Sequence, residues 1–190
     1  MRKFSFRPVL TIKGRTFKGL RGWAGKPLHP PLTDIPVAAY LFVGAFDLLS
    51  FLTRNRESDL PTEFYRAATW VLLGGAAFSL LAALTGWADW HRSSTPGTQA
   101  RRTVNAHAVL MIGTTLMVLT NLALRLGPGD GDAKVPAVCL LLSLAAVVSV
   151  TLGSTYGGSL VFDYGFNVET SGDHPVWHES ETDVFPGEKH

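Results

Sequence analysis

Four stretches of the chain are almost entirely apolar, and polar segments separate them. They cover residues 35–53, 67–88, 103–124 and 135–162, and Asp47 in the first is the only formally charged residue among them. About 20 apolar residues at a rise of 1.5 Å cross a hydrocarbon core of about 30 Å. A soluble bundle would show charged outer faces at a helical period, whereas the second and fourth stretches are apolar all round. The pattern predicts four transmembrane helices.

The segments between these stretches are typical of short connections. Charged residues, Pro and Gly gather there, as they do in turns and loops. Because short connections make consecutive helices antiparallel neighbours, we expect an all-α, four-helix transmembrane bundle with up-down-up-down topology. The bundle is expected within residues 27–168, with helices at about 35–53, 64–90, 103–125 and 135–162.

Composition supports a membrane protein and excludes several other classes. Charged residues make up 17% of the chain, below the roughly 25% of ordinary soluble domains. The mean hydropathy of +0.18 excludes global disorder and points away from a nucleic-acid-binding protein. Cys139 is the single cysteine, which excludes an internal disulfide and any metal site built on several thiolates.

Charge is distributed unevenly between the two ends of the chain. Residues 1–26 contain eight Lys or Arg and no acid, whereas residues 163–190 contain seven Asp or Glu and one Lys. Placing both termini on the cytoplasmic side of the plasma membrane puts twelve basic residues inside and five outside, in line with the positive-inside rule. We therefore expect a basic cytoplasmic arm at 1–26 and an acidic cytoplasmic tail at 169–190.

The basic arm has three alternative roles. It can lie on anionic lipid, extend as a flexible arm, or pair with the acidic tail on the same face. The expected partners of the protein are the lipid bilayer and a protein or redox complex that docks at the cytoplasmic face. No nucleic-acid partner is expected.

One end of the predicted bundle collects most of the unusual polar side chains. The candidate metal ligands at this end are His29, Asp34, Asp89 and His107. Imidazole and carboxylate groups from three helices can bind zinc, iron or copper, and two histidines can ligate a haem. Arg101 and Arg102 lie at the same end, and their guanidinium groups suit haem propionates or an anionic headgroup.

A structural role explains some of the same residues without a cofactor. Asp34 can cap the amino terminus of the first helix. Asp89 can pair with Arg92, three residues further along the second helix. The sequence leaves both alternatives open.

The third helix carries a polar stripe. His107, Thr114 and Asn121 follow one another at intervals of seven residues. Because polar groups are costly in lipid, we expect the stripe to face the bundle interior. It can line a quinone, haem or proton pocket, or simply make hydrogen bonds between helices.

Asp47 is an ionisable residue within a predicted span, which makes it a candidate functional residue by default. It lies roughly 9 Å inside the end of the first helix. The alternative is a carboxylate that reaches the membrane interface or pairs with Arg54.

Small residues recur at four-residue intervals in two of the helices. In the second predicted helix, Ser79 follows Gly75 by four residues and Gly86 follows Ala82 by four. In the fourth, Gly157 follows Gly153 by four. Such spacing lets helix backbones approach closely in lipid, so we expect these positions to pack the helices together.

Four segments resemble the motifs of a known membrane family. They are His-Pro-Pro-Leu-Thr-Asp-Ile-Pro at 29–36, Thr-Gly-Trp-Ala-Asp-Trp at 85–90, Arg-Arg with Asn-Ala-His at 101–107, and Tyr-Gly-Gly-Ser-Leu-Val-Phe-Asp-Tyr-Gly at 156–165. In this order they are similar to the family catalogued as domain of unknown function 2231, over about residues 25–170.

The resemblance implies a four-helix membrane fold without an established activity. Some relatives are joined to Rieske iron–sulfur modules, which implies a link to electron transfer. The matched positions include all four candidate metal ligands, so the resemblance supports the same cluster. At Ser159 the chain departs from the family, whose closing motif often has a histidine there. If that histidine is a ligand in the relatives, the site in this chain is altered.

Two functional hypotheses follow. The first is an integral membrane anchor or accessory subunit, without independent catalytic activity, linked to a membrane electron-transfer complex. The alternative is a haem- or metal-binding, quinone-linked redox protein with a His and Asp cluster at the cytoplasmic face. In the alternative, the cofactor-binding residues are His29, His107, Arg101 and Arg102.

Overall fold

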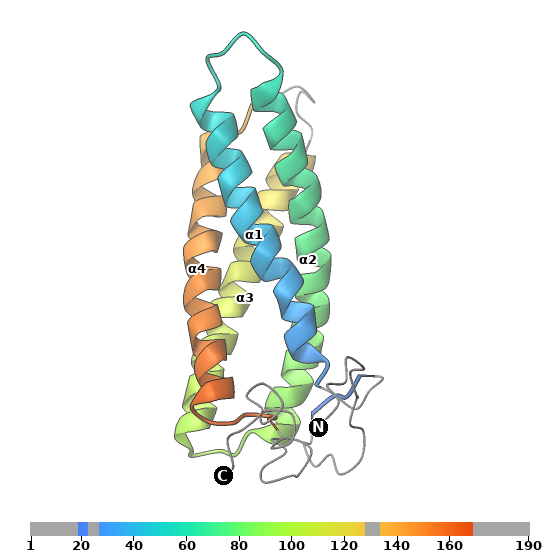
Figure 1. Ribbon diagram of the computed structural model, residues 1–190, viewed down its shortest axis with the longest axis vertical. Coiled ribbons are helices and arrows are strands. Elements are labelled where there is room, and N and C mark those ends of the chain that lie inside the picture. Colours follow the sequence, from blue (N-terminus) through green and yellow to red (C-terminus); the bar gives the residue numbers. More distant parts are fainter. Residues whose placement is uncertain (1–18, 23–26, 128–133, 169–190) are drawn as a thin grey trace, which may run out of the picture.

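A computed structural model describes residues 19–22, 27–127 and 134–168. It contains four helices, α1 (His29–Leu52), α2 (Leu60–Ser93), α3 (Gln99–Leu126) and α4 (Ala137–Phe162), shown in Figure 1. Each helix is long and apolar enough to cross a membrane, as the hydrophobic pattern predicts. Within the described residues, the extended structure is limited to an isolated bridge between Arg21 and Pro27.

The first helix begins at His29, earlier than the predicted start at residue 35. Proline lies in its first turn, where a missing N–H costs nothing and the fixed φ angle already suits a helix. Asp34 therefore lies inside α1, with its side chain exposed, and the residue at the cap is Leu28. The predicted capping role of Asp34 is wrong, because the two prolines extend the helix past it.

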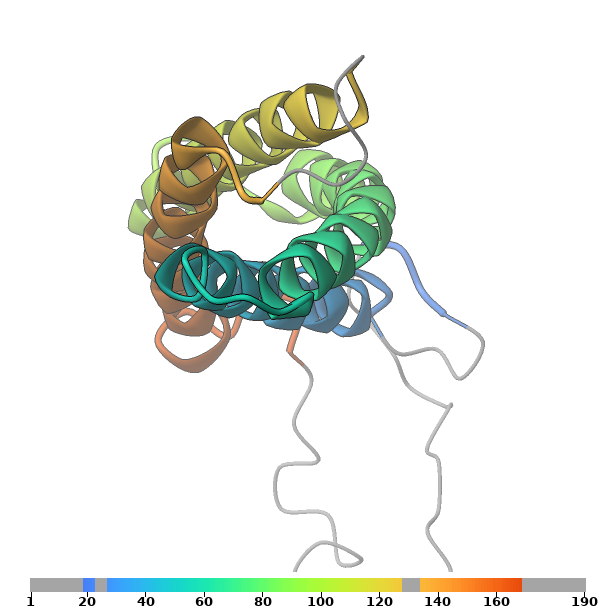
Figure 2. The same cartoon turned by 90° about the horizontal axis from the view of Figure 1, so that it is seen from above.

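Hydrogen bonds between helix ends link the helices in two pairs, which we call hairpins. In the hairpin of α1 and α2, Ser50 Oγ near the end of α1 donates to the carbonyl of Pro61 at the start of α2, over 2.7 Å. In the hairpin of α3 and α4, Asn121 Nδ2 donates to the carbonyl of Cys139, over 3.1 Å. Figure 2 shows the four helices arranged as a ring in chain order. We call the end where α1 begins and α4 ends the arm side, and the opposite end the loop side.

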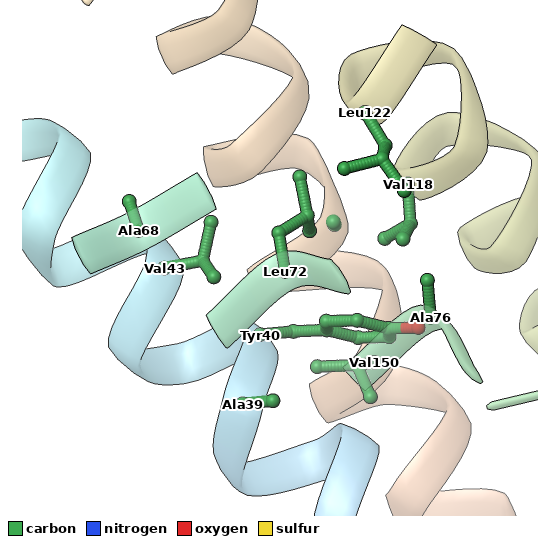
Figure 3. Packing of buried hydrophobic residues seen from close by; sticks show 10 residues of the cluster. Ala39, Tyr40, Val43, Ala68, Leu72, Ala76, Val118, Leu122 and Val150 are labelled. Carbon is green, nitrogen blue, oxygen red and sulfur yellow. The ribbon is translucent and has the colours of Figure 1, made fainter. Parts of the chain in front are cut away.

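The centre of the bundle is filled by apolar side chains from all four helices. Tyr40 and Leu72 are fully buried beside Val118 and Val150 (Figure 3). The Tyr40 hydroxyl donates to the carbonyl of Gly75 over 3.4 Å, which satisfies its polar end. Most large apolar side chains outside this cluster are exposed, as a surface that faces lipid requires.

Replacing Gly75 by alanine is expected to lower stability by about 1–3 kcal/mol, the usual cost of overpacking. A Cβ atom at Gly75 would lie 2.8 Å from the Cβ of Ala39 and 3.0 Å from Tyr40 Cε1, so α1 and α2 must separate. Gly74 is a matched control, because a Cβ there meets no atom within 4 Å. Unfolding by SDS in mixed micelles measures the difference. Equal stability of the two variants would show that close helix approach at Gly75 is unimportant.

Candidate functional site

Two histidines from different hairpins lie at the arm side. His29 Nδ1 on α1 is 2.9 Å from the carbonyl oxygen of Ala82 and 3.2 Å from Thr85 Oγ1, both on α2. His107 Nδ1 on α3 is 2.8 Å from the carbonyl oxygen of Gly153 on α4. A carbonyl oxygen only accepts hydrogen bonds, so Nδ1 is the donor in both rings. In the neutral form of each ring the lone pair is therefore on Nε2.

A glycine of the neighbouring helix lies against each imidazole ring. A Cβ atom at Gly86 would lie 2.7 Å from His29 Cε1, and one at Gly157 would lie 3.2 Å from His107 Cε1. The small-residue positions predicted to pack helices therefore also make room for the two histidine rings. Each ring is fixed by a backbone carbonyl and a glycine of its own hairpin.

The two histidines have matched surroundings. Both residues are half-buried. Each ring bonds a carbonyl of its own hairpin through Nδ1, so each ring has one nitrogen that its carbonyl bond does not use.

Asp89 is buried, and its partner differs from the predicted one. Asp89 Oδ1 accepts a hydrogen bond of 2.9 Å from the backbone N–H of Leu20. Arg92 is exposed. The predicted pairing of Asp89 with Arg92 is wrong, because a segment preceding α1 supplies the donor instead.

The two arginines at the arm side have different surroundings. Arg101 Nη1 donates to the carbonyl of Trp90 over 3.3 Å and also to Ser94 Oγ. Its Cζ atom lies 3.7 Å from the centroid of the Trp90 ring, whose Nε1 donates to Asn105 Oδ1 over 2.8 Å. Arg101 therefore stabilises the connection between α2 and α3. Arg102 is exposed, and its Nε donates to Gln99 Oε1 in the first turn of α3 over 2.9 Å.

The predicted metal ligands do not gather at one point. Within the described ranges, no group of three or more His, Cys, Asp and Glu side chains is arranged to hold a metal ion. A zinc site needs three or four protein ligands. A haem needs only one or two, because its macrocycle supplies four nitrogens. Two imidazoles are too few for such a zinc site, and they match the number of protein ligands that a haem takes.

A second polar cluster, which we call the Asp47–Arg125 centre, lies near the loop side. Asp47 on α1 and Arg125 on α3 form an ion pair whose two side chains are fully buried. Arg125 Nε donates to Asn121 Oδ1 over 2.9 Å, and its Nη1 donates to Thr69 Oγ1 over 3.2 Å. Ser143 Oγ on α4 donates to Asp47 Oδ2, so the centre joins all four helices.

This centre corrects one expectation and confirms another. Asp47 pairs with Arg125, and Arg54 instead lies over the Phe51 ring, 4.9 Å from its centroid. The predicted inward direction of the stripe on α3 is confirmed, because Thr114 and Asn121 are buried and bonded to α4. Sequence reasoning missed Arg125. Its position four residues after Asn121, on the same helix face, is the signal that indicates its inward direction.

A family model described as "Predicted membrane protein (DUF2231)" matches residues 25–170. The match covers all four helices and both polar clusters. No curated protein and no protein of solved structure matches the chain.

Proposed function

The chain belongs to this family of predicted membrane proteins, DUF2231, and on that premise we propose that it is a haem-binding subunit of a membrane electron-transfer complex. His29 and His107 would hold the haem iron through their Nε2 atoms. The haem supplies one-electron chemistry by cycling between its ferric and ferrous states. The chain's own residues fix the orientation of the two rings.

The observation that carries this proposal is the hydrogen bonding of the two histidines. An axial or metal-ligating histidine usually donates its other ring N–H to a carbonyl or carboxylate, which fixes the tautomer and the ring orientation. Both His29 and His107 donate Nδ1–H to a backbone carbonyl. They come from α1 and α3, which lie on opposite sides of the ring of helices (Figure 2).

The position of the two histidines along the bundle also supports the proposal. Trp70 and Trp87 on α2 are 73% and 64% exposed, and they lie about 25 Å apart along the helix axis. Exposed tryptophans are enriched at both membrane interfaces. Thr85, which contacts His29, is one half-turn from Trp87. We place the histidines just inside the cytoplasmic boundary of a bundle that crosses the plasma membrane up, down, up and down.

A second candidate function is a cofactor-free anchor for a soluble redox partner. It is favoured by the common position of the two described chain ends, since α1 begins and α4 ends at the arm side (Figure 1). The helix ends that connect to the basic residues 1–26 and to the acidic tail are therefore at the same end of the bundle. In this case the histidines only link helices, and electrons do not pass through the bundle.

A visible absorption spectrum of the detergent-purified protein, before and after dithionite, distinguishes the two functions. We expect a Soret band that sharpens on reduction, and about one haem per chain in a pyridine haemochrome assay. Growth with added haem precursor excludes under-loading as the reason for a weak band. A flat spectrum from haem-replete cells would overturn haem binding and favour the anchor. Zinc without haem would indicate a different ligand set.

A further inference from the structure

Residues 19–22, which we call the strap, cross the arm side of the bundle. The backbone N–H of Leu20 donates to Asp89 Oδ1 on α2 over 2.9 Å. The carbonyl of Leu20 accepts from the N–H of Leu28, immediately before α1, over 3.0 Å. The strap is therefore fixed to both helices of the first hairpin.

The strap also reaches the second hairpin. A Cβ atom at Gly19 would lie 3.0 Å from Nδ2 of Asn167, which follows α4. That Nδ2 atom is buried and has no hydrogen-bond partner among the described residues. Asn167 has a φ of 56°, a left-handed conformation that few residue types adopt readily. The strap therefore contacts the segment that follows α4 as well as both helices of the first hairpin.

Close packing explains why a glycine lies at the end of the strap. A Cβ atom at Gly19 would lie 2.2 Å from Asp89 Oδ1, closer than atoms can approach. Because glycine has no Cβ atom, the backbone at Gly19 can lie directly against the Asp89 carboxylate. The bond is buried, because Asp89 is only 5% exposed, and a hydrogen bond to a charged acceptor is stronger than one between neutral groups.

We propose that the strap covers the His29–His107 site at the arm side, with the hydrogen bond from the Leu20 N–H to Asp89 Oδ1 as its latch. Opening the latch exposes the site to water and to a soluble electron donor or acceptor. The electron-transfer role of this closure rests on the proposed function, whereas the closure itself does not. Asp89 lies one helical turn beyond Thr85, whose Oγ1 is 3.2 Å from His29 Nδ1, so the latch lies one turn of α2 from the site.

Hydrogen–deuterium exchange of the full-length protein in nanodiscs tests the latch. Asp89→Asn weakens the hydrogen-bond acceptor of Leu20 with little change of side-chain shape. Gly19→Ala changes the strap instead, by placing a Cβ atom too close to Asp89. We expect the amides of Leu20 and Leu28 to exchange about tenfold faster in both variants. Asp163→Asn, an exposed carboxylate at the same end, is the matched control. Unchanged exchange in both latch variants would overturn the proposal.

Access to the site is measured separately, with a readout chosen by the haem content. If the protein holds haem, reduction by dithionite should be about tenfold faster in Asp89→Asn than in Asp163→Asn. If it holds none, the proposed function fails and closure is judged by diethylpyrocarbonate modification of His29 and His107. Exposed His91 serves as the internal reference. Faster exchange at the latch without faster access to the histidines would show that the strap closes nothing.

Discussion

Replacing Asp47 by alanine is expected to destabilise the folded protein by about 3–5 kcal/mol. The cost arises because Arg125 keeps its charge and would lie buried without an anionic partner. Thr69 and Asn121 would still accept hydrogen bonds from the guanidinium group, but they are neutral and cannot balance the charge. SDS unfolding in mixed micelles, followed by tryptophan fluorescence, measures the loss.

Two further variants separate charge imbalance from lost packing. Asp59→Ala removes an exposed carboxylate near the same end and should change stability by less than about 0.5 kcal/mol. The double variant Asp47→Leu with Arg125→Met removes both charges and should recover most of the loss, since apolar replacements of buried ion pairs are often tolerated. If the double variant is as unstable as Asp47→Ala, the ion pair itself is a net source of stability.

Substitution of His107 by alanine is expected to leave less than about a tenth of the parent haem content, with the helices retained. The same result is expected for His29→Ala, because loss of either imidazole removes one axial ligand. Pyridine haemochrome assays and far-ultraviolet circular dichroism measure haem and helix content in parallel.

His91→Ala is the matched control for this pair. His91 is exposed and stacks on Trp87 outside the bundle, with ring centroids 5.9 Å apart, so its loss should leave the haem content unchanged. Equal haem in all three variants would show that the iron is bound elsewhere. A loss of haem only in variants that also unfold would indicate a structural role for the histidines.

The four helices could be predicted because membrane spans are recognised by length and apolar content alone. The boundaries were less predictable, since Pro30 and Pro31 suit either a turn before a helix or its first turn. His29 and His107 were identified as candidates from their position near helix ends. Their hydrogen-bond partners are backbone carbonyls of Ala82 and Gly153, and side-chain identity gives no indication of which carbonyl a ring will meet.

The partners of the buried acids illustrate the same limit. Arginines nearby in the sequence were the predicted partners of Asp47 and Asp89. Their partners in the structure are Arg125 and the N–H of Leu20, respectively. Both partners are distant along the chain, and one belongs to the backbone. Only the packing of the two hairpins determines such pairs. The polar stripe on α3 was predictable because all of its residues belong to one helix, and their spacing along the sequence shows that they share a face.

The Asp47–Arg125 ion pair also has a consequence for the order in which the protein is made. Asp47 belongs to α1, which leaves the ribosome before α3, and its partner on α3 is 78 residues further along the chain. The first hairpin therefore enters the bilayer with an unbalanced carboxylate, and only the third helix brings the matching cation. Docking of that helix balances the buried carboxylate, so the ion pair can form only when α3 packs against the first hairpin.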